Sequence, residues 1–218
     1  MPIQTKICGI TTPETLDAAI KGGASHIGFM FFPPSPRAVS FEKASELAAR
    51  VPGHVRKVGV FVEPCNALLD QAIEAAGLDV IQMHKTPANR AAAIAAHASL
   101  ECWAAVAVKT RADLAEVGRY QGAVTRILYD AKAPKESAIP GGLGVRFDWS
   151  LLTGFAHPLP WILAGGLDPN NVGQAIAMTG ADFVDVSSGV ESAPGFKDVD
   201  KIAAFLKAAA GINSRRSS

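Results

Sequence analysis

Two turns near the carboxyl end of the chain have the composition of a phosphate-binding site. The apolar runs Trp161–Ala164 and Phe183–Val186 each end at small residues, and a helical pattern separates them. Glycines at the ends of buried parallel strands let backbone N–H groups approach an anion closely. Glycines that only make tight turns are the alternative. The residues that we expect at this phosphate site are Ala164, Gly165, Gly166, Ser188 and Gly189.

A thiol and a carboxyl group elsewhere in the chain could transfer protons. Cys8 ends a strand-like run in which alternation also turns Lys6 inward, and the lysine charge should favour the thiolate, which is the basic form. Asp130 ends an apolar run, and such surroundings raise the pKa of a carboxyl group toward neutrality. From these residues alone, an inert buried thiol and a carboxylate that only bonds to a turn remain alternatives.

Strand alternation predicts a contact between Lys6 and Asp185. Asp185 lies on the last predicted strand, which neighbours the first strand in a closed barrel. A lysine that faces the interior cannot stay charged without a partner, so we expect an ion pair between the two side chains. Binding of a sugar hydroxyl is the functional alternative for Asp185, and the two roles are compatible.

Three further polar side chains are candidates for substrate binding. Gln82 and His84 share one alternation face of a strand, although a core histidine with satisfied hydrogen bonds is an equal alternative. Arg37 follows a stretch with three prolines, which stiffen an exposed loop. A guanidinium held there could form a bidentate pair with a carboxylate, whereas a solvated loop arginine is the alternative.

The elements that must position these residues alternate between strand and helix patterns. Capping residues such as Thr12, Ser40, Thr86 and Asp168 mark helix starts. We predict an α/β fold, a single (β/α)8 TIM barrel with eight parallel strands over residues 1–211, and a disordered tail over residues 212–218. The predicted strands start near Thr5, His26, Arg56, Val80, Glu101, Arg126, Trp161 and Phe183.

Two connections are longer than a barrel requires. They span residues 32–40 and 131–146, and both follow the carboxyl end of a predicted strand. Barrel enzymes carry out their chemistry at that end, so both segments are candidate lids or substrate clamps.

Composition excludes several classes of protein. The chain has 218 residues and a net charge of +1, which implies no basic face for nucleic acid. Its three cysteines have no C-x-x-C spacing, which argues against a disulfide framework and against a zinc site. There is no charged and apolar leader, and no apolar stretch approaches the ~18 residues of a membrane span. We therefore expect a cytoplasmic protein without a membrane partner.

Taken together, the motifs resemble those of phosphoribosylanthranilate isomerase. The resemblance runs in order from Lys6 to about Leu206, and the combination is specific although each motif alone is not. The residues that carry it are Lys6–Thr11, Gly28–Phe32, Ser35–Arg37, Val58–Val62, Gln82–His84, Asp130, Gly141 and Gly142, Phe147–Trp149, Leu163–Leu167 and Asp185–Glu191.

The resemblance implies a barrel enzyme of tryptophan biosynthesis that uses no cofactor and no metal. Its reaction would be an Amadori rearrangement of N-(5-phosphoribosyl)anthranilate to 1-(2-carboxyphenylamino)-1-deoxyribulose 5-phosphate. By position in the family motifs, Cys8 would be the general base, Asp130 the general acid, and Arg37 the contact to anthranilate. Backbone of the last two turns would hold the phosphate, and we add Gly142 and Gly144 to that set. We expect a small-molecule phosphosugar as the partner and a monomer, with a homodimer as the alternative.

Two positions depart from the family pattern. Leu143 stands where the family usually has Thr or Asn, and Lys85 stands where Gly commonly follows the histidine. Neither position is the acid or the base, so the departures concern loop geometry and affinity. The alternatives to the isomerase are a different phosphosugar barrel enzyme and a phosphosugar-binding barrel with impaired catalysis.

Overall fold

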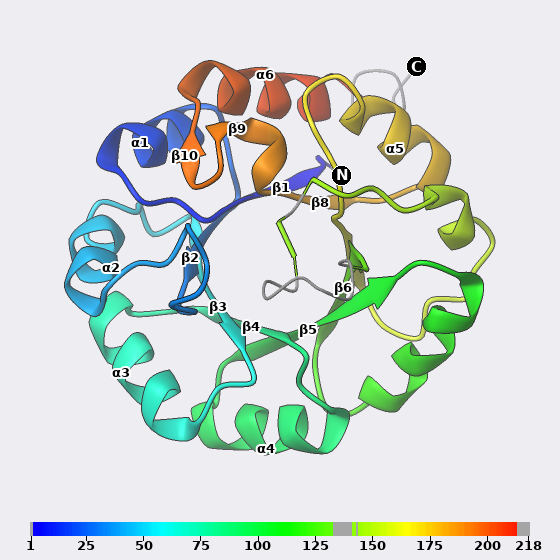
Figure 1. Cartoon of the computed structure of the whole chain (residues 1–218), viewed down its shortest axis with the longest axis horizontal. Coiled ribbons are helices and arrows are strands. Elements are labelled where there is room, and N and C mark those ends of the chain that lie inside the picture. Colours follow the sequence, from blue (N-terminus) through cyan, green and yellow to red (C-terminus); the bar gives the residue numbers. More distant parts are fainter. Residues whose placement is uncertain (1, 133–140, 143, 213–218) are drawn as a thin grey trace.

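The strands form a closed parallel barrel, in the order β1 to β8, in a computed structural model that describes residues 2–132, 141–142 and 144–212. Figure 1 shows the barrel along its axis. The eight predicted strands are confirmed, and only the first begins one residue earlier than predicted. The strands are β1 Gln4–Cys8, β2 His26–Met30, β3 Arg56–Val62, β4 Val80–His84, β5 Glu101–Val108, β6 Arg126–Ala131, β7 Trp161–Leu163 and β8 Phe183–Val186.

Helices surround the barrel (Figure 1). Their buried faces are rich in alanine and leucine, which lets them pack closely on the strands. The α-helices are α1 Pro13–Lys21, α2 Phe41–Ala48, α3 Asn66–Ala76, α4 Ala88–Ala98, α5 Val172–Thr179 and α6 Val199–Ala210. Tighter 3₁₀ turns are η1 Arg111–Tyr120, which takes the place of a helix after β5, η2 Trp149–Leu152 before β7, and η3 Ser188–Val190 after β8.

Of the four capping residues named above, two cap their helices and two do not. The side chains of Thr12 and Ser40 accept hydrogen bonds from the first turns of α1 and α2. Thr86 instead donates its hydroxyl to the His84 carbonyl oxygen, and α4 begins after Pro87. Asp168 accepts from two following backbone N–H groups in a turn, and α5 begins three residues later than predicted, after Asn171. Local side-chain bonds to the backbone compete with helix formation at both places.

The barrel encloses one hydrophobic cluster, and a larger one fills the space between strands and helices. Both faces of the strands are buried, which explains the continuous apolar runs in the sequence. The fully buried Trp103 lies on the inner face. The inner cluster consists of Cys8, Val58, Val60, Val80, Trp103, Leu128, Ile162, Ala164 and Phe183. Cys8 therefore faces the barrel interior, which is the condition under which alternation also turns Lys6 inward.

A short antiparallel hairpin follows the turn after β8 and was not predicted. It consists of β9 Glu191–Ala193 and β10 Phe196–Lys197. Figure 1 shows that it lies inward of α1 and α6, beside β1. The hairpin thereby carries its charged residues toward the barrel end instead of leaving them on a solvated loop.

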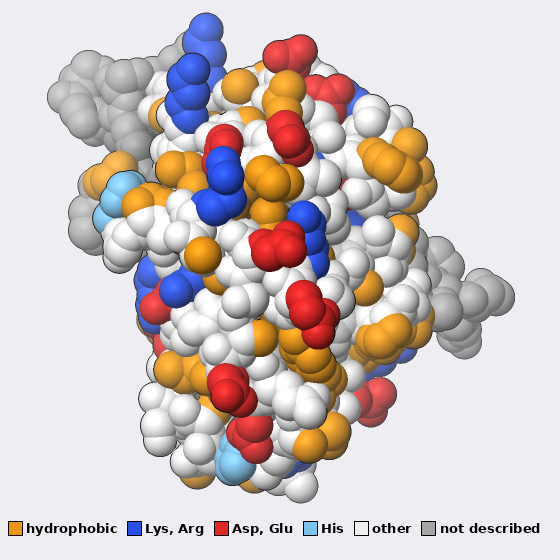
Figure 2. Space-filling view, turned by 90° about the vertical axis from the view of Figure 1, so that its left-hand side faces the viewer, with side chains coloured by type: hydrophobic (Ala, Val, Ile, Leu, Met, Phe, Trp, Pro, Cys, Tyr) orange, Lys and Arg blue, Asp and Glu red, His pale blue; other side chains and the backbone are white. Residues whose placement is uncertain are grey.

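The remaining expectations about the chain concern its end and its surface. Ile212, which we assigned to the tail, packs partly buried against the core, while residues 213–218 and residues 133–140 of the second long connection lie outside the described part. Acidic and basic side chains are intermixed over the face shown in Figure 2, and this face has no extended basic patch among its described residues. Within the described part of the chain, no helix has the length and apolar character needed to cross a membrane.

Lys85 has a left-handed backbone, with φ of 53°, directly after β4. Such a conformation costs a residue with a Cβ about 1 kcal/mol relative to glycine. We predict that Lys85→Gly raises the free energy of unfolding by about 0.5–1 kcal/mol, measured by urea denaturation. Lys207→Gly, in the exposed face of α6, is the matched control and should lower it by about 1 kcal/mol. Equal losses in both variants would contradict the strain at Lys85.

Candidate active site

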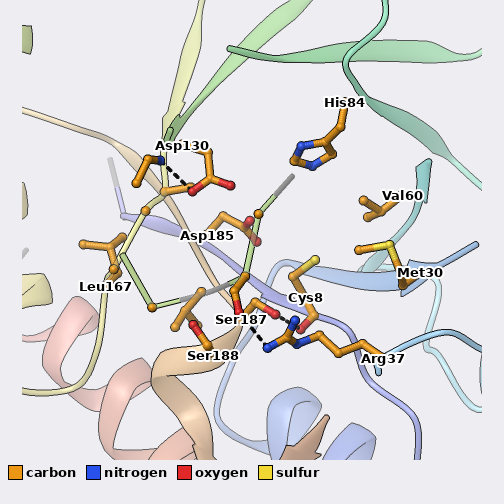
Figure 3. A pocket seen from close by; sticks show the side chains of 18 of the residues that line it. Cys8, Met30, Arg37, Val60, His84, Asp130, Leu167, Asp185, Ser187 and Ser188 are labelled. Carbon is orange, nitrogen blue, oxygen red and sulfur yellow. Dashed lines mark hydrogen bonds between the residues drawn. The ribbon is translucent and has the colours of Figure 1, made fainter. Parts of the chain in front are cut away.

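The predicted site residues converge on one pocket at the carboxyl ends of the strands. Twelve of the thirteen line it, and Figure 3 shows Cys8 and Asp130 on different sides of Asp185. Gly189 does not line it and packs against the Leu167 carbonyl oxygen, which leaves no room for a Cβ. The predicted residues that line the pocket are Cys8, Arg37, Gln82, His84, Asp130, Gly142, Gly144, Ala164, Gly165, Gly166, Asp185 and Ser188.

The predicted ion pair between Lys6 and Asp185 is confirmed. The Nζ of Lys6 donates to Oδ1 of Asp185 at 2.8 Å, and the two residues are register partners on β1 and β8. The Lys6 side chain is fully buried. Burial lowers the pKa of Lys6, but Asp185 and Cys8 outweigh it, so that the pKa is raised and the lysine stays charged. The pair closes the seam between the first and last strands.

Cys8 is a buried thiol at the end of β1, 5% exposed. Burial raises its pKa, the charge of Asp185 raises it further, and Lys6 lowers it. The effect of Lys6 thus has the predicted sign, but burial outweighs it. Gly28 on β2 leaves the space for the thiol, because a Cβ there would lie 3.1 Å from the sulfur. Cys8 is therefore a weakly ionised thiol whose thiolate would be a strong base.

Asp130 lies near the end of the apolar strand β6, and its half-buried carboxyl group lines the pocket. Burial raises its pKa to about 7, and Asp185 adds to the effect, while the backbone N–H of Ala131 and the charge of Lys6 oppose it. The Ala131 N–H donates to Oδ1 at 2.8 Å and fixes the orientation of the carboxyl group. A Cβ on Gly141 would lie 2.5 Å from the other oxygen, Oδ2. Asp130 can therefore hold a proton at neutral pH and present it to the pocket.

His84 and Gln82 are bonded to each other on β4. The Gln82 side-chain nitrogen lies 3.0 Å from Nε2 of His84, and burial lowers the pKa of His84 to about 4. The histidine is therefore neutral. Among the described residues, the Gln82 Oε1 atom is buried without a hydrogen-bond partner. An orphaned polar atom in a pocket wall is expected to bond to a ligand.

Arg37 is buried and not solvated, at 4% exposure. Its Nε and Nη2 donate to the two oxygens of Glu191 at 2.7 and 2.8 Å, and Nη2 also donates to the Gly142 carbonyl oxygen at 2.8 Å. Within the described part of the chain, only Nη1 keeps both of its N–H groups unbonded. Nη1 is therefore the atom of Arg37 that remains open to an anion in the pocket.

The two glycine turns supply backbone donors side by side. The N–H groups of Gly165, Gly166, Ser188 and Gly189 have no hydrogen-bond partner within the described part of the chain. The N–H of Ala164 already donates to the Tyr129 carbonyl oxygen at 2.8 Å. Ala164 therefore lines the pocket but has no free N–H group for a phosphate. Gly165 needs its positive φ of 80° and its missing side chain, because a Cβ would lie 2.6 Å from the Ala131 nitrogen. A phosphate could accept several of these N–H groups at once.

Sequence reasoning missed Glu191, Lys197 and Ser187. Glu191 is separated from Arg37 by 154 positions, so no local pattern marks the contact. Its signal in the sequence was its place at the end of the motif Asp185–Glu191, which did not indicate a partner. Within the described residues, no three His, Cys, Asp or Glu side chains gather in an arrangement that could hold a metal ion.

The fold and the pocket define a barrel enzyme of the phosphosugar type, with a thiol, a carboxyl group and two glycine turns around one cavity. The sequence profile described as "N-(5'phosphoribosyl)anthranilate (PRA) isomerase" matches residues 5–208. The chain belongs to the N-(5'-phosphoribosyl)anthranilate isomerase family, as the motifs indicated. The family match favours the isomerase over the other phosphosugar barrels that we considered.

Similar proteins cover nearly the whole chain. The N-(5'-phosphoribosyl)anthranilate isomerase of Zymomonas mobilis subsp. pomaceae is 52% identical over 95% of this chain and 98% of its own length. That of Paramagnetospirillum magneticum is 50% identical over 97% and 99%. Among solved structures, phosphoribosyl anthranilate isomerase from Thermotoga maritima has a TM-score of 0.86 and 36% identity, and covers 96% of this chain and 99% of its own. The predicted barrel is thereby confirmed.

Removal of the Asp185 charge should destabilise the barrel strongly. Asp185→Asn leaves the Lys6 ammonium without a counter-charge in the interior, so we predict a loss of about 3–5 kcal/mol in the free energy of unfolding, measured by urea denaturation. Glu116→Gln breaks an ion pair to Arg119 whose side chains are 53% and 72% exposed, and it is the control. It should cost less than about 1 kcal/mol. Similar losses in both variants would mean that the interior ion pair contributes no more to the free energy of unfolding than the exposed one.

Proposed function

We propose that the chain isomerises N-(5'-phosphoribosyl)anthranilate with Asp130 as general acid and Cys8 as general base. The observation that carries this assignment is the presence of a carboxyl group with a pKa of about 7 and a buried thiol in the same pocket. A proton donor and a proton acceptor are what an aldose-to-ketose rearrangement requires.

The steps use these two groups alone. Asp130 gives its proton to the ribose ring oxygen while the bond from that oxygen to C1' breaks, and the anilino nitrogen forms a double bond to C1'. The Cys8 thiolate then removes the proton from C2', and the released electron pair forms the C1'–C2' double bond of an enolamine. Tautomerisation to the ketone completes the product. Each positioned proton transfer contributes about 10²–10⁴-fold in rate.

The remaining residues of the pocket would hold the substrate. Arg37 would bind the anthranilate carboxylate through Nη1, because its other edge is bonded to Glu191. The phosphate would accept the unbonded N–H groups of Gly165, Gly166 and Ser188, with Gly142 and Gly144 on the same side of the pocket. The sugar hydroxyls would lie near Asp185, Gln82 and His84. One of them could donate a hydrogen bond to Oε1 of Gln82, which has no partner among the described residues.

A relative supports this kind of substrate. A solved phosphoribosyl anthranilate isomerase in complex with reduced 1-(o-carboxyphenylamino)-1-deoxyribulose 5-phosphate has a TM-score of 0.83 and is 34% identical to this chain. The Thermotoga maritima relative is described as dimeric. A monomer, with a homodimer as the alternative, and a cytoplasmic location stay predictions for this chain.

Removal of either proton-transfer group should abolish most of the turnover. Cys8→Ala loses the base and Asp130→Asn loses the acid, so we predict that kcat falls about 10²–10⁴-fold in each. The measurement follows the fluorescence of freshly prepared phosphoribosylanthranilate as it is consumed. Cys65→Ser and Asp70→Asn change the same residue types at exposed positions outside the pocket and are the controls.

The outcome separates the alternatives. Near-normal turnover in either variant would refute the role of that residue. An inactive wild-type protein that still binds the substrate would support the alternative of a phosphosugar-binding barrel with impaired catalysis.

The pH dependence follows from the order of the two pKa values. The active form has a deprotonated Cys8 and a protonated Asp130, but Asp130 has a pKa of about 7 and the pKa of Cys8 is raised. Below about pH 7 the thiolate of Cys8 becomes more abundant as the pH rises, so we predict that kcat/KM rises. Above pH 7 the loss of protonated Asp130 offsets this gain, so kcat/KM should stay level until Cys8 ionises and then fall.

The variant Asp130→Asn tests the assignment of the two limbs. It cannot ionise at this position, so its residual kcat/KM should keep rising with pH until Cys8 ionises. Because both proteins act on the same substrate, ionisation of the substrate phosphate affects the two profiles equally. A level region near pH 8 that persists in Asp130→Asn would contradict the assignment of the pKa near 7 to Asp130.

A further inference from the structure

The hairpin β9–β10 carries a buried ion pair beside the pocket. The Nζ of Lys197 lies 2.6 Å from Oε1 of Glu191, and the two side chains are 0% and 4% exposed. Buried charges are costly unless strong hydrogen bonds surround them. Glu191 also accepts the N–H of Gly195 at 3.2 Å, in the turn of its own hairpin. The carboxylate is thus fixed to the hairpin on one side.

On its other side the Glu191 carboxylate holds Arg37. Two parallel bonds, from Nε at 2.7 Å and from Nη2 at 2.8 Å, occupy one edge of the guanidinium. Paired charge-assisted bonds of this kind fix direction as well as distance. Two cations share one carboxylate here, so one positive charge is left for an anion in the pocket. The free Nη1 is the atom of Arg37 that such an anion can reach.

Lys197 connects the same hairpin to the thiol. Its Nζ donates to the carbonyl oxygen of Ser187 at 3.0 Å and to the Ser187 hydroxyl at 3.3 Å. The Ser187 hydroxyl in turn donates to the carbonyl oxygen of Cys8 at 3.2 Å. Figure 3 shows Cys8, Ser187 and Arg37 close together on one side of the pocket. Lys197 thus braces the backbone from which the thiol projects.

We propose that Glu191 and Lys197 are positioning residues of this enzyme. Glu191 fixes the direction in which Arg37 presents Nη1 to the carboxylate of the substrate, and Lys197 fixes the Cys8 backbone through Ser187. The inference rests on the proposed function and assigns a separate role to each of the two residues. Glu191 acts on binding of the anthranilate half, and Lys197 acts on the proton-transfer step.

Binding of two ligands tests the role of Glu191 without turnover. Reduced 1-(o-carboxyphenylamino)-1-deoxyribulose 5-phosphate carries the aryl carboxylate, and ribose 5-phosphate lacks it. We expect Glu191→Gln to weaken binding of the first about tenfold or more, and that of the second less than about twofold, by isothermal titration calorimetry. Equal loss for both ligands, or loss for neither, would overturn the proposal.

A second variant guards against misfolding. Glu191→Asp keeps the charge but is one methylene shorter, so it cannot reach both Nε and Nη2 from the same backbone. It should show the same selectivity for the carboxylate ligand with a smaller loss. Arg37→Met combined with Glu191→Gln completes a double-mutant cycle, in which the second change adds little if Glu191 acts through Arg37.

Turnover separates the two members of the pair. We expect Glu191→Gln to raise KM about tenfold with kcat changed less than about threefold, and Lys197→Met to lower kcat about tenfold with KM changed less than about threefold. The same pattern in both variants would indicate a merely structural hairpin and overturn the proposal. A wild-type protein that neither binds the carboxyphenylamino compound nor consumes phosphoribosylanthranilate would refute the proposed function itself.

Discussion

The ion pair between Lys6 and Asp185 inside the barrel is the interaction on which the rest of the structure depends. It joins the first and last strands, and its lysine is fully buried while its aspartate lines the pocket. Asp185 raises the pKa of both Cys8 and Asp130, and Lys6 lowers both. The Lys6–Asp185 pair therefore influences the protonation of both Cys8 and Asp130. A change to either member of the pair affects its partner and both of these groups.

Burial sets the chemistry more strongly than these charges do. It is the largest cause of the raised pKa of Cys8 and of Asp130, and it acts on both in the direction of the protonated form. A protonated carboxyl group is what an acid needs at neutral pH. A protonated thiol is the opposite of what a base needs, but a thiolate formed against such a pKa removes a proton from carbon more readily. In this pocket the Cys8 thiolate is therefore scarce at neutral pH, but it is a stronger base.

The sequence predicted the barrel because its strands are buried on both faces and appear as separate apolar runs. Strand parity predicted that Lys6 and Asp185 meet, since alternation and closure together decide which side chains face each other. The starts of α4 and α5 were wrong because the Thr86 hydroxyl and the Asp168 carboxylate bond to nearby backbone instead of capping a helix. Glu191 was not predicted because its contact with Arg37 arises from a hairpin whose docking no local pattern encodes.

The contact with Glu191 explains how an arginine on a connecting loop can recognise a ligand with precision. The prolines beside Arg37 and the bond from its N–H to the Ser35 hydroxyl, at 3.2 Å, restrict only the backbone. The side chain has several rotatable bonds and about 2 kcal/mol of conformational entropy to lose. Glu191 immobilises it during folding, so the entropy is not lost again when a ligand binds. Because the hairpin that carries Glu191 also carries Lys197, the anchor for Arg37 and the brace for Cys8 share one small element, and their relative position is fixed by its fold.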